Sequence, residues 1–255
     1  LNDVTFYASS AAQTVNITIS GSKSTEEKIY VRYTNDNWST DNFIVATGSG
    51  TSYSAEIPTQ SIGATVVYYV FTTTLAYSGG GDLDNYTDLC TINYENNSGS
   101  NYTYVVGRAT TQAGNWNTTA TWLDGAVPTG STDDVIIAND VTIDEVGATD
   151  AECDDLTIAS GATLTLDNSG VIKHTIHGTV VIFGNAVIND GSFFDITKKL
   201  KIKSTGNLTL KSGGELTVDN NTTNDGTFTI ESTSSGTGSF ISLGTTTNSG
   251  TNTIQ

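Results

Sequence analysis

The chain has 255 residues, of which 10 are basic and 27 acidic, so its formal net charge is -17. A chain this acidic disfavours contact with nucleic-acid phosphates, and no apolar run reaches the roughly 18 residues of a membrane-spanning helix, so neither nucleic-acid binding nor membrane insertion is expected. Its 26 glycines do not recur at every third position, which excludes a collagen-like protein. The first residue is Leu rather than Met, so we expect a processed, secreted chain.

Residues 1–106 contain short runs in which apolar and polar side chains alternate. Five of these runs lie at residues 15–19, 28–33, 52–57, 65–72 and 102–106. Clusters of turn-forming residues, such as those at 21–24, separate them. Alternation with a period of two at such intervals is typical of antiparallel strands. The pattern predicts an immunoglobulin-like β-sandwich over residues 1–106.

Residues 81–88, with the sequence GDLDNYTD, place Asp82, Asp84 and Asp88 in one loop. Calcium binds several oxygen ligands at close range, so these three residues are a candidate Ca2+ site. The alternative is a group of solvated acids, because the loop lacks the internal glycine and the terminal glutamate of an EF-hand. The two cysteines, Cys90 and Cys153, are either one disulfide or two separate thiols.

Residues 107–255 have a different rhythm, in which short apolar triplets recur at fixed intervals. Units of the Leu-Thr-Ile type lie at residues 156–158, 164–166, 208–210 and 216–218. The first and third residues of each triplet would point into the core, and the central Thr would point outward. Three such strands in a coil of about two dozen residues predict a parallel β-helix over residues 107–255. Residues 114–144, with Trp116 and Trp122, are the expected N-terminal cap.

The stretch KIYVRYTNDNWSTDNF at residues 28–43 resembles the signature of starch- and glycogen-binding modules. The matching residues are Val31, Arg32, Thr34, Asp36 and Trp38. This resemblance implies an immunoglobulin-like fold and an α-glucan ligand. It covers about one sixth of residues 1–106.

Residues 57–74 and 114–144 are similar to accessory modules and β-solenoid stalks of secreted Bacteroidetes-type proteins. Such proteins are typically exported by type IX secretion and end in a sorting domain. The resemblance implies an extracellular or cell-surface location. It also implies a longer parent protein, because the sequence ends within the repeat pattern.

Trp38 is the centre of the candidate ligand-binding site, which also contains Tyr33, Asn35 and Arg32. Exposed aromatic rings stack on the C–H faces of sugars, while neighbouring Asn and Arg side chains bind the hydroxyls. A polar turn precedes Trp38, which would present its ring to solvent. The alternative is that Trp38 and the tyrosines belong to the core.

These observations favour a non-catalytic module that recognises glycans or adheres to a surface, displayed on a rigid β-solenoid. The second hypothesis is a purely structural surface or filament subunit that binds other proteins. The third is a polysaccharide hydrolase, because Asp154, Asp155, His177 and Lys201 follow the chain order of pectin-hydrolase motifs. Lys stands at 201 where those motifs have an arginine. The pair Asp154 and Asp155 is also explained as the turn before a strand.

Overall fold

The computed structural model describes residues 7–9, 12–74, 93–144, 151–167, 173–233 and 236–254. It is an all-β protein with a β-solenoid of about five turns, so the predicted β-helix is confirmed. The chain forms two compact units, Leu1–Val106 and Gly107–Gln255, named here unit 1 and unit 2. The boundary between the units falls inside strand β9 (Tyr102–Ala109).

Unit 1 has two sheets, and all registers among β2 to β9 are antiparallel. In the first sheet β3 lies between β4 and β7, both β8 and β9 pair with the other edge of β7, and β1 pairs with β9. Its strands are β1 (Tyr7–Ser9), β3 (Lys28–Thr34), β4 (Asn42–Val45), β7 (Thr65–Thr73), β8 (Asn93–Glu95) and β9. The second sheet, in the order β2-β6-β5, contains β2 (Gln13–Thr18), β5 (Thr47–Ser49) and β6 (Ser52–Ile57). A short 3-10 helix, η1 (Asn97–Gly99), precedes β9.

Alternating residues of the two sheets form one apolar core in unit 1. On β3, Ile29, Val31 and Tyr33 are buried in the same cluster as Val15 and Ile17 of β2. Residues next to them on β3 point to the opposite face, as the pleat of a strand requires. The two-sheet arrangement agrees with the alternation in the sequence. The immunoglobulin-like classification stays a prediction.

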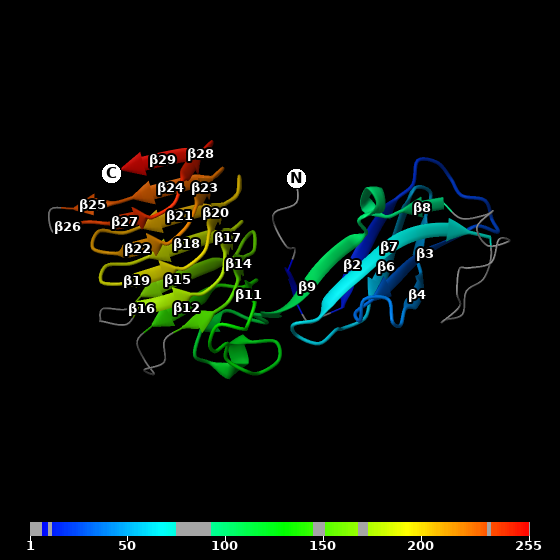
Figure 1. Ribbon diagram of the computed structural model, residues 1–255, viewed down its shortest axis with the longest axis horizontal. Coiled ribbons are helices and arrows are strands. Elements are labelled where there is room, and N and C mark those ends of the chain that lie inside the picture. The colour runs from blue at the N-terminus through cyan, green and yellow to red at the C-terminus, as the bar shows by residue number, and fades with distance from the viewer. Residues whose placement is uncertain are drawn as a thin grey trace. The chain divides into compact units, whose positions relative to one another are not determined.

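Unit 2 contains three parallel sheets, whose strands are stacked coil upon coil (Figure 1). The first solenoid sheet follows the end of β9 and contains β11 (Val135–Ile137), β14 (Leu156–Ile158), β17 (Val180–Ile182), β20 (Leu200–Ile202), β23 (Thr222–Asn224) and β28 (Thr246–Asn248). The second contains β10 (Gly114–Asn115), β12 (Val141–Asp144), β15 (Thr163–Asp167), β18 (Asn185–Ile188), β21 (Asn207–Leu210), β24 (Thr227–Ile230) and β29 (Thr251–Ile254). The third contains β13 (Glu152–Cys153), β16 (Lys173–Ile176), β19 (Phe193–Ile196), β22 (Glu215–Val218) and β27 (Ser239–Ser242). A small hairpin of β25 (Ser232–Thr233) and β26 (Gly236–Thr237) and a 3-10 helix, η2 (Thr119–Thr121), complete the unit.

The strands of successive coils pair in register. In the first solenoid sheet, Leu156 pairs with Val180, Val180 with Leu200 and Leu200 with Thr222, at separations of 24, 20 and 22 residues. These separations agree with the coil length that the sequence predicts. Glycine is required where one coil passes close to the preceding one: a Cβ at Gly206 would overlap the carbonyl oxygen of Ile182.

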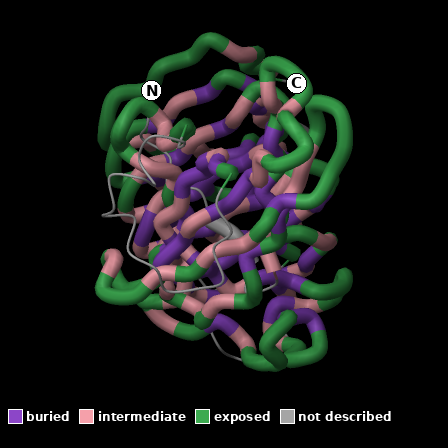
Figure 2. The backbone as a smooth tube through the Cα atoms, turned by 90° about the vertical axis from the view of Figure 1, so that its right-hand side faces the viewer, coloured by how far each residue is buried: buried purple, intermediate pink, exposed green. Residues whose placement is uncertain are grey.

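The inward positions form a continuous apolar stack, in which buried residues alternate with less buried ones along the strands. Figure 2 shows the backbone coloured by burial, with exposed residues gathered in the loops at the periphery of the view. Ile158, Leu166, Ile202, Leu210 and Val218 all have exposed fractions of 0% and belong to one cluster, as predicted. The central threonines of the same triplets are half-buried. The inward and outward register of the triplets is therefore confirmed.

The inward positions become polar in the later coils of the first solenoid sheet. Asn224 of β23 lies in register with Ile202 but is an amide, and it is 2% exposed. Its Nδ2 donates to Oδ1 of Asn248 at 2.9 Å and to Oδ1 of Asn252 at 2.8 Å. Hydrogen-bonded amides thus replace apolar packing in this part of the solenoid, and the bonds offset the cost of burying them.

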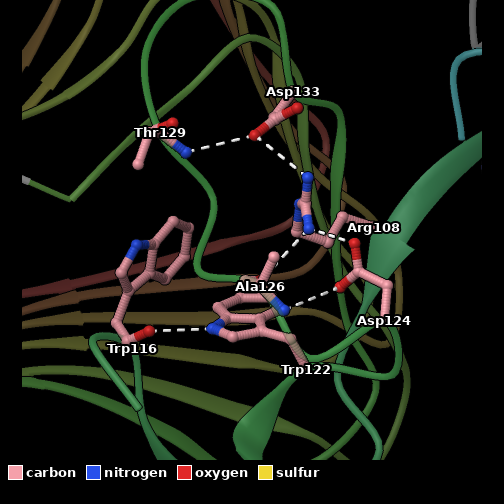
Figure 3. Close-up of polar contacts among 7 residues, drawn as sticks. All are labelled: Arg108, Trp116, Trp122, Asp124, Ala126, Thr129 and Asp133. Carbon is pink, nitrogen blue, oxygen red and sulfur yellow. Dashed lines mark hydrogen bonds and ion pairs between the residues drawn. The ribbon is translucent and has the colours of Figure 1, made fainter. Parts of the chain in front are cut away.

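The N-terminal end of unit 2 is closed by a pair of tryptophans. Trp116 and Trp122 are 0% and 2% exposed, and their rings meet edge to face with centroids 5.0 Å apart. The indole Nε1 of Trp122 donates to the carbonyl oxygen of Trp116 at 2.8 Å, and nearby Arg108 forms ion pairs with Asp124 and Asp133 (Figure 3). Both tryptophans pack in the solenoid core, which agrees with their expected role in a cap. The strands β11 and β12 of the predicted cap already pair in register with the next coil.

Replacing Ile202 by Asp should destabilise unit 2 by about 3–5 kcal/mol, because it removes a buried apolar side chain and leaves a charge in the core. Thr209→Asp, at an outward position of β21, should change the free energy of unfolding by less than about 1 kcal/mol. Urea unfolding followed by circular dichroism measures both values. Equal losses in the two variants would contradict the assigned register.

Candidate functional site

The pleat of β3 separates the predicted ligand-binding residues. Tyr33 is 7% exposed and lies in the core between the two sheets of unit 1. Arg32, the residue before it, lies on the outer face of the first sheet, where Trp38 also packs. The structure therefore brings Arg32 and Trp38 together, and Tyr33 lies on the other side of the sheet.

Arg32 is surrounded by three aromatic rings and one carboxylate. Its guanidinium carbon lies 5.2 Å from the ring centroid of Trp38, 5.4 Å from that of Phe43 and 5.9 Å from that of Tyr69. Its Nε forms an ion pair with Asp41, and its Nη1 donates to the Tyr69 hydroxyl at 2.9 Å. Burial by itself would lower the pKa of Arg32, but the bonds to Tyr69 and Asp41 outweigh it and raise that pKa. These five residues are named here the arginine–aromatic cluster.

The turn before Trp38 is organised by Thr34 and Asp36. The Thr34 hydroxyl donates to Asp36 Oδ1 at 2.7 Å and accepts from the backbone N–H of Trp38 at 3.1 Å. The carboxylate of Asp36 also accepts from the backbone N–H and the hydroxyl of Thr40, at 2.9 and 2.7 Å. The bonds from Thr40 and Thr34 lower the pKa of Asp36. Both residues that anchor the turn belong to the motif quoted for residues 28–43.

Trp38 has an uncommon backbone conformation. Its φ is 67°, and that of Asn37 is 57°, so two successive residues lie in the left-handed region. A large side chain rarely adopts this region, which costs roughly 1–2 kcal/mol relative to ordinary conformations. The bonds of Thr34 and Asp36 hold the turn in place. As a result the half-buried Trp38 ring lies against Arg32, with its centroid 5.7 Å from that of Tyr69.

Asn35 lies at the exposed beginning of the same turn. Its Nδ2 donates to Gln60 Oε1 at 2.8 Å, so its amide is directed toward the loop before β7. Two members of the cluster, Asp41 and Tyr69, were not predicted from the sequence. Phe43 and Tyr69 are the cross-strand partners of Arg32 on β4 and β7, and that register could not be read from the sequence.

The candidate calcium ligands Asp82, Asp84 and Asp88 lie outside the described residues, and so does Cys90. Within the described ranges, no group of three or more His, Cys, Asp or Glu side chains is arranged to hold a metal ion. Cys153 carries a free thiol in the core of unit 2. Burial raises its pKa well above the usual value, so the thiol is neutral.

The acidic residues quoted for the hydrolase hypothesis lie at a corner of the solenoid. Asp155 Oδ1 accepts from the backbone N–H of Thr179 in the next coil, and Asp134 Oδ1 accepts from the backbone N–H of Asp155 at 3.3 Å. Asp154 forms an ion pair with Lys198 at 3.4 Å. Each of these carboxylates joins one coil to another, which gives them a structural role at this corner.

No family model, no curated protein and no solved structure matches the chain. Among the described residues, no helix has the length and apolar character needed to span a membrane. The interpretation of the site therefore depends on the geometry of the arginine–aromatic cluster.

Asp134 makes the stability of unit 2 depend on pH. Burial, together with repulsion from Asp155, Asp154 and Asp133, raises its pKa from 3.8 to about 6. The folded state therefore binds this proton more tightly than the unfolded state. The resulting stabilisation is complete below about pH 4 and is lost as the pH rises through about 6.

Asp134→Asn should raise the melting temperature of unit 2 at pH 8 and leave it nearly unchanged at pH 3.5. The amide keeps the oxygen that accepts from Asp155 but carries no charge. Asp219→Asn, at an exposed position on another coil, is the control for removing one negative charge. A gain for Asp134→Asn that is the same at both pH values would contradict the assignment.

Proposed function

We propose that unit 1 is a glycan-recognition module and that unit 2 is a rigid β-solenoid stalk that displays it outside the cell. The binding surface in this proposal is the arginine–aromatic cluster on the outer face of β3, β4 and β7. The proposed ligand is an α-glucan, and the module is non-catalytic. The two antiparallel sheets around a shared core support an immunoglobulin-like classification of unit 1.

The backbone conformation of Trp38 is the observation that carries the proposal. A tryptophan in the left-handed region is disfavoured where glycine would be unstrained. The turn nevertheless places a large, half-buried ring beside a guanidinium and a carboxylate. Strained residues are concentrated at functional sites, because the surrounding structure can hold a side chain where a ligand needs it.

The chemistry of the cluster suits a sugar. The Trp38 ring supplies an apolar face for the C–H groups of a pyranose, and Arg32 and Asp41 supply a donor and an acceptor for its hydroxyls. Arg32 is fixed between rings and bonded to Tyr69, so it loses little freedom when a ligand binds. Thr34 and Asp36, the other polar residues of the starch-binding resemblance, orient the turn that presents Trp38.

The regular construction of unit 2 supports its assignment as a stalk. Coils of 20–24 residues are stacked in register around one buried core, which makes the unit stiff. Asp154 and Asp155, which a hydrolase would need for proton transfer, are engaged between coils. This engagement favours a structural role for these carboxylates.

Trp38→Gly tests the binding surface with little effect on folding. Glycine is unstrained at φ 67°, so the relief of strain offsets part of the packing lost with the ring. In titrations of the 15N-labelled protein with maltohexaose, the Trp38 indole N–H and the Arg32 Nε–H should shift in the wild type, with an affinity near millimolar. The Arg32 shift should be lost in Trp38→Gly.

Asn37→Gly is the matched control, because it relieves the backbone strain of another left-handed residue in the same turn and leaves the Trp38 ring in place. Its affinity for maltohexaose should lie within about twofold of the wild-type value. No shift of the Trp38 and Arg32 signals in the wild-type protein would refute this surface as a glycan site. So would equal weakening by Asn37→Gly and Trp38→Gly.

A further inference from the structure

A line of cavities follows β2 in unit 1. Their volumes are about 450, 390 and 320 Å³. The first and second share Ile19, Ile29, Thr72 and Asn93 as lining residues, and the second and third share Val15, Tyr68 and Tyr102. Because neighbouring cavities have common walls, they form one elongated groove, named here the β2 groove.

The β2 groove lies between an edge of one sheet and the strands of the other. β2 is the terminal strand of the order β2-β6-β5, and the opposite wall comes from β7, β8 and β9. β9 pairs with the first part of β7, at Thr65–Tyr68, and β8 with a later part, at Val70–Thr72. Among the described residues of unit 1, the apolar side chains of Val15 and Ile17 line the groove along β2, and each is 9% exposed.

Tyrosine rings dominate one wall of the groove. Tyr68 and Tyr102 are stacked, with ring centroids 5.3 Å apart and an interplanar angle of 23°. The Tyr102 hydroxyl donates to Glu95 Oε1 at 3.0 Å, which fixes the direction of its ring. Rigid, partly accessible rings of this kind provide large contact areas at a low entropic cost.

Tyr104 contributes a polar atom without a partner. It lines the cavity near Gln13 and is 3% exposed, and its hydroxyl has no hydrogen-bond partner among the described residues. Burial raises the pKa of Tyr104 to about 12, so the hydroxyl keeps its proton. Leaving a buried hydroxyl unpaired costs roughly 1–3 kcal/mol.

The charges around the groove select the class of ligand. Neither of the two cavities that contain Tyr68 and Tyr102 is lined by Lys or Arg, and Glu95 is their one carboxylate among the described residues. The remaining cavity is lined by one charged residue of each sign, Lys23 and Glu27. With a net charge of -17 on the chain, an acidic polymer would be repelled. The amide of Asn93 supplies a neutral donor and acceptor in the same wall.

We propose that the β2 groove is a second binding site, for an extended neutral polysaccharide chain. Its elongated form suits a polymer, its stacked tyrosine rings suit the apolar faces of sugars, and the amide of Asn93 suits their hydroxyls. None of the residues of the arginine–aromatic cluster lines the three cavities, so the two sites have separate residues. This inference takes its ligand class from the proposed function but places it at another site.

The test is a site-resolved titration of the full 15N-labelled chain. The probes are the neutral hexaoses of maltose, cellulose, xylan and laminarin type, with hexagalacturonate as the acidic comparison. The side-chain amide signal of Asn93 and the backbone amide signal of Ile17 report on the groove, and the indole signal of Trp38 reports on the arginine–aromatic cluster. At least one neutral hexaose should shift the groove signals, and hexagalacturonate should not.

Substitutions at Tyr102 test the role of the ring. Tyr102→Ala should weaken binding in the groove about tenfold, whereas Tyr102→Phe, which keeps the ring, should stay within about threefold of the wild type. Trp38→Gly should leave the groove signals and their affinity unchanged. If thermal melting shows that Tyr102→Ala does not fold, Asn93→Ala at an exposed lining position replaces it, with an expected loss of about threefold.

The outcomes separate the two proposals. Shifts at Trp38 without shifts at Ile17 and Asn93 would overturn the groove and leave the proposed function intact. Shifts at neither site with any hexaose would overturn both. Groove shifts that hexagalacturonate produces as strongly as a neutral hexaose would overturn the assigned ligand class. If Tyr102→Ala or Asn93→Ala binds the hexaose with the wild-type affinity, the assignment of that residue to the wall of the groove is overturned.

Discussion

Parallel pairing in register between successive coils is the interaction on which unit 2 depends. Since each residue lies beside its counterpart one coil away, an inward Leu or Ile always meets another inward side chain, and the apolar stack is continuous from Val135 to Phe228. A slip of one residue would turn the whole set outward. The same register brings the carbonyl oxygen of Ile182 against Gly206, and aligns the carboxylates of Asp134 and Asp155 with backbone amides. The hydrogen bonds of these carboxylates at the corner of the solenoid therefore follow from the stacking of the coils in register.

In unit 1 the alternation along β3 determines both the core and the proposed site. Odd-numbered residues from Ile29 to Tyr33 face the second sheet, and Arg32 faces outward toward rings from β4 and β7. The outer face of this sheet is consequently rich in aromatic side chains, while the β2 groove opens on its inner side. Two proposed binding surfaces thus lie on opposite faces of one sheet. Their residues are adjacent in sequence but separated by the pleat.

The solenoid core could be predicted because the direction of a side chain in a strand is local information. The spacing of Ile158 and Leu166, or of Ile202 and Leu210, is enough to assign them to the interior. The surroundings of Trp38 depend on pairing between distant strands, and Arg32 and Tyr69 are 37 residues apart. For that reason the sequence indicated Trp38 and Arg32 but placed Tyr33 beside them and missed Asp41 and Tyr69. The β2 groove was not predicted, because a cavity depends on how two sheet edges meet.

Cysteine cross-linking between neighbouring coils is the most direct test of the register. In a protein with Cys90→Ser, Val187→Cys combined with Thr209→Cys places two thiols at directly paired outward positions. Paired strands lie about 4.8 Å apart, within the Cα separation that a disulfide accepts, whereas a partner shifted by two residues lies beyond about 7 Å. We expect rapid oxidation of this pair and no cross-link between Asn185→Cys and Thr209→Cys, as measured by mass spectrometry. Efficient cross-linking of the shifted pair, with none at 187 and 209, would contradict the in-register solenoid.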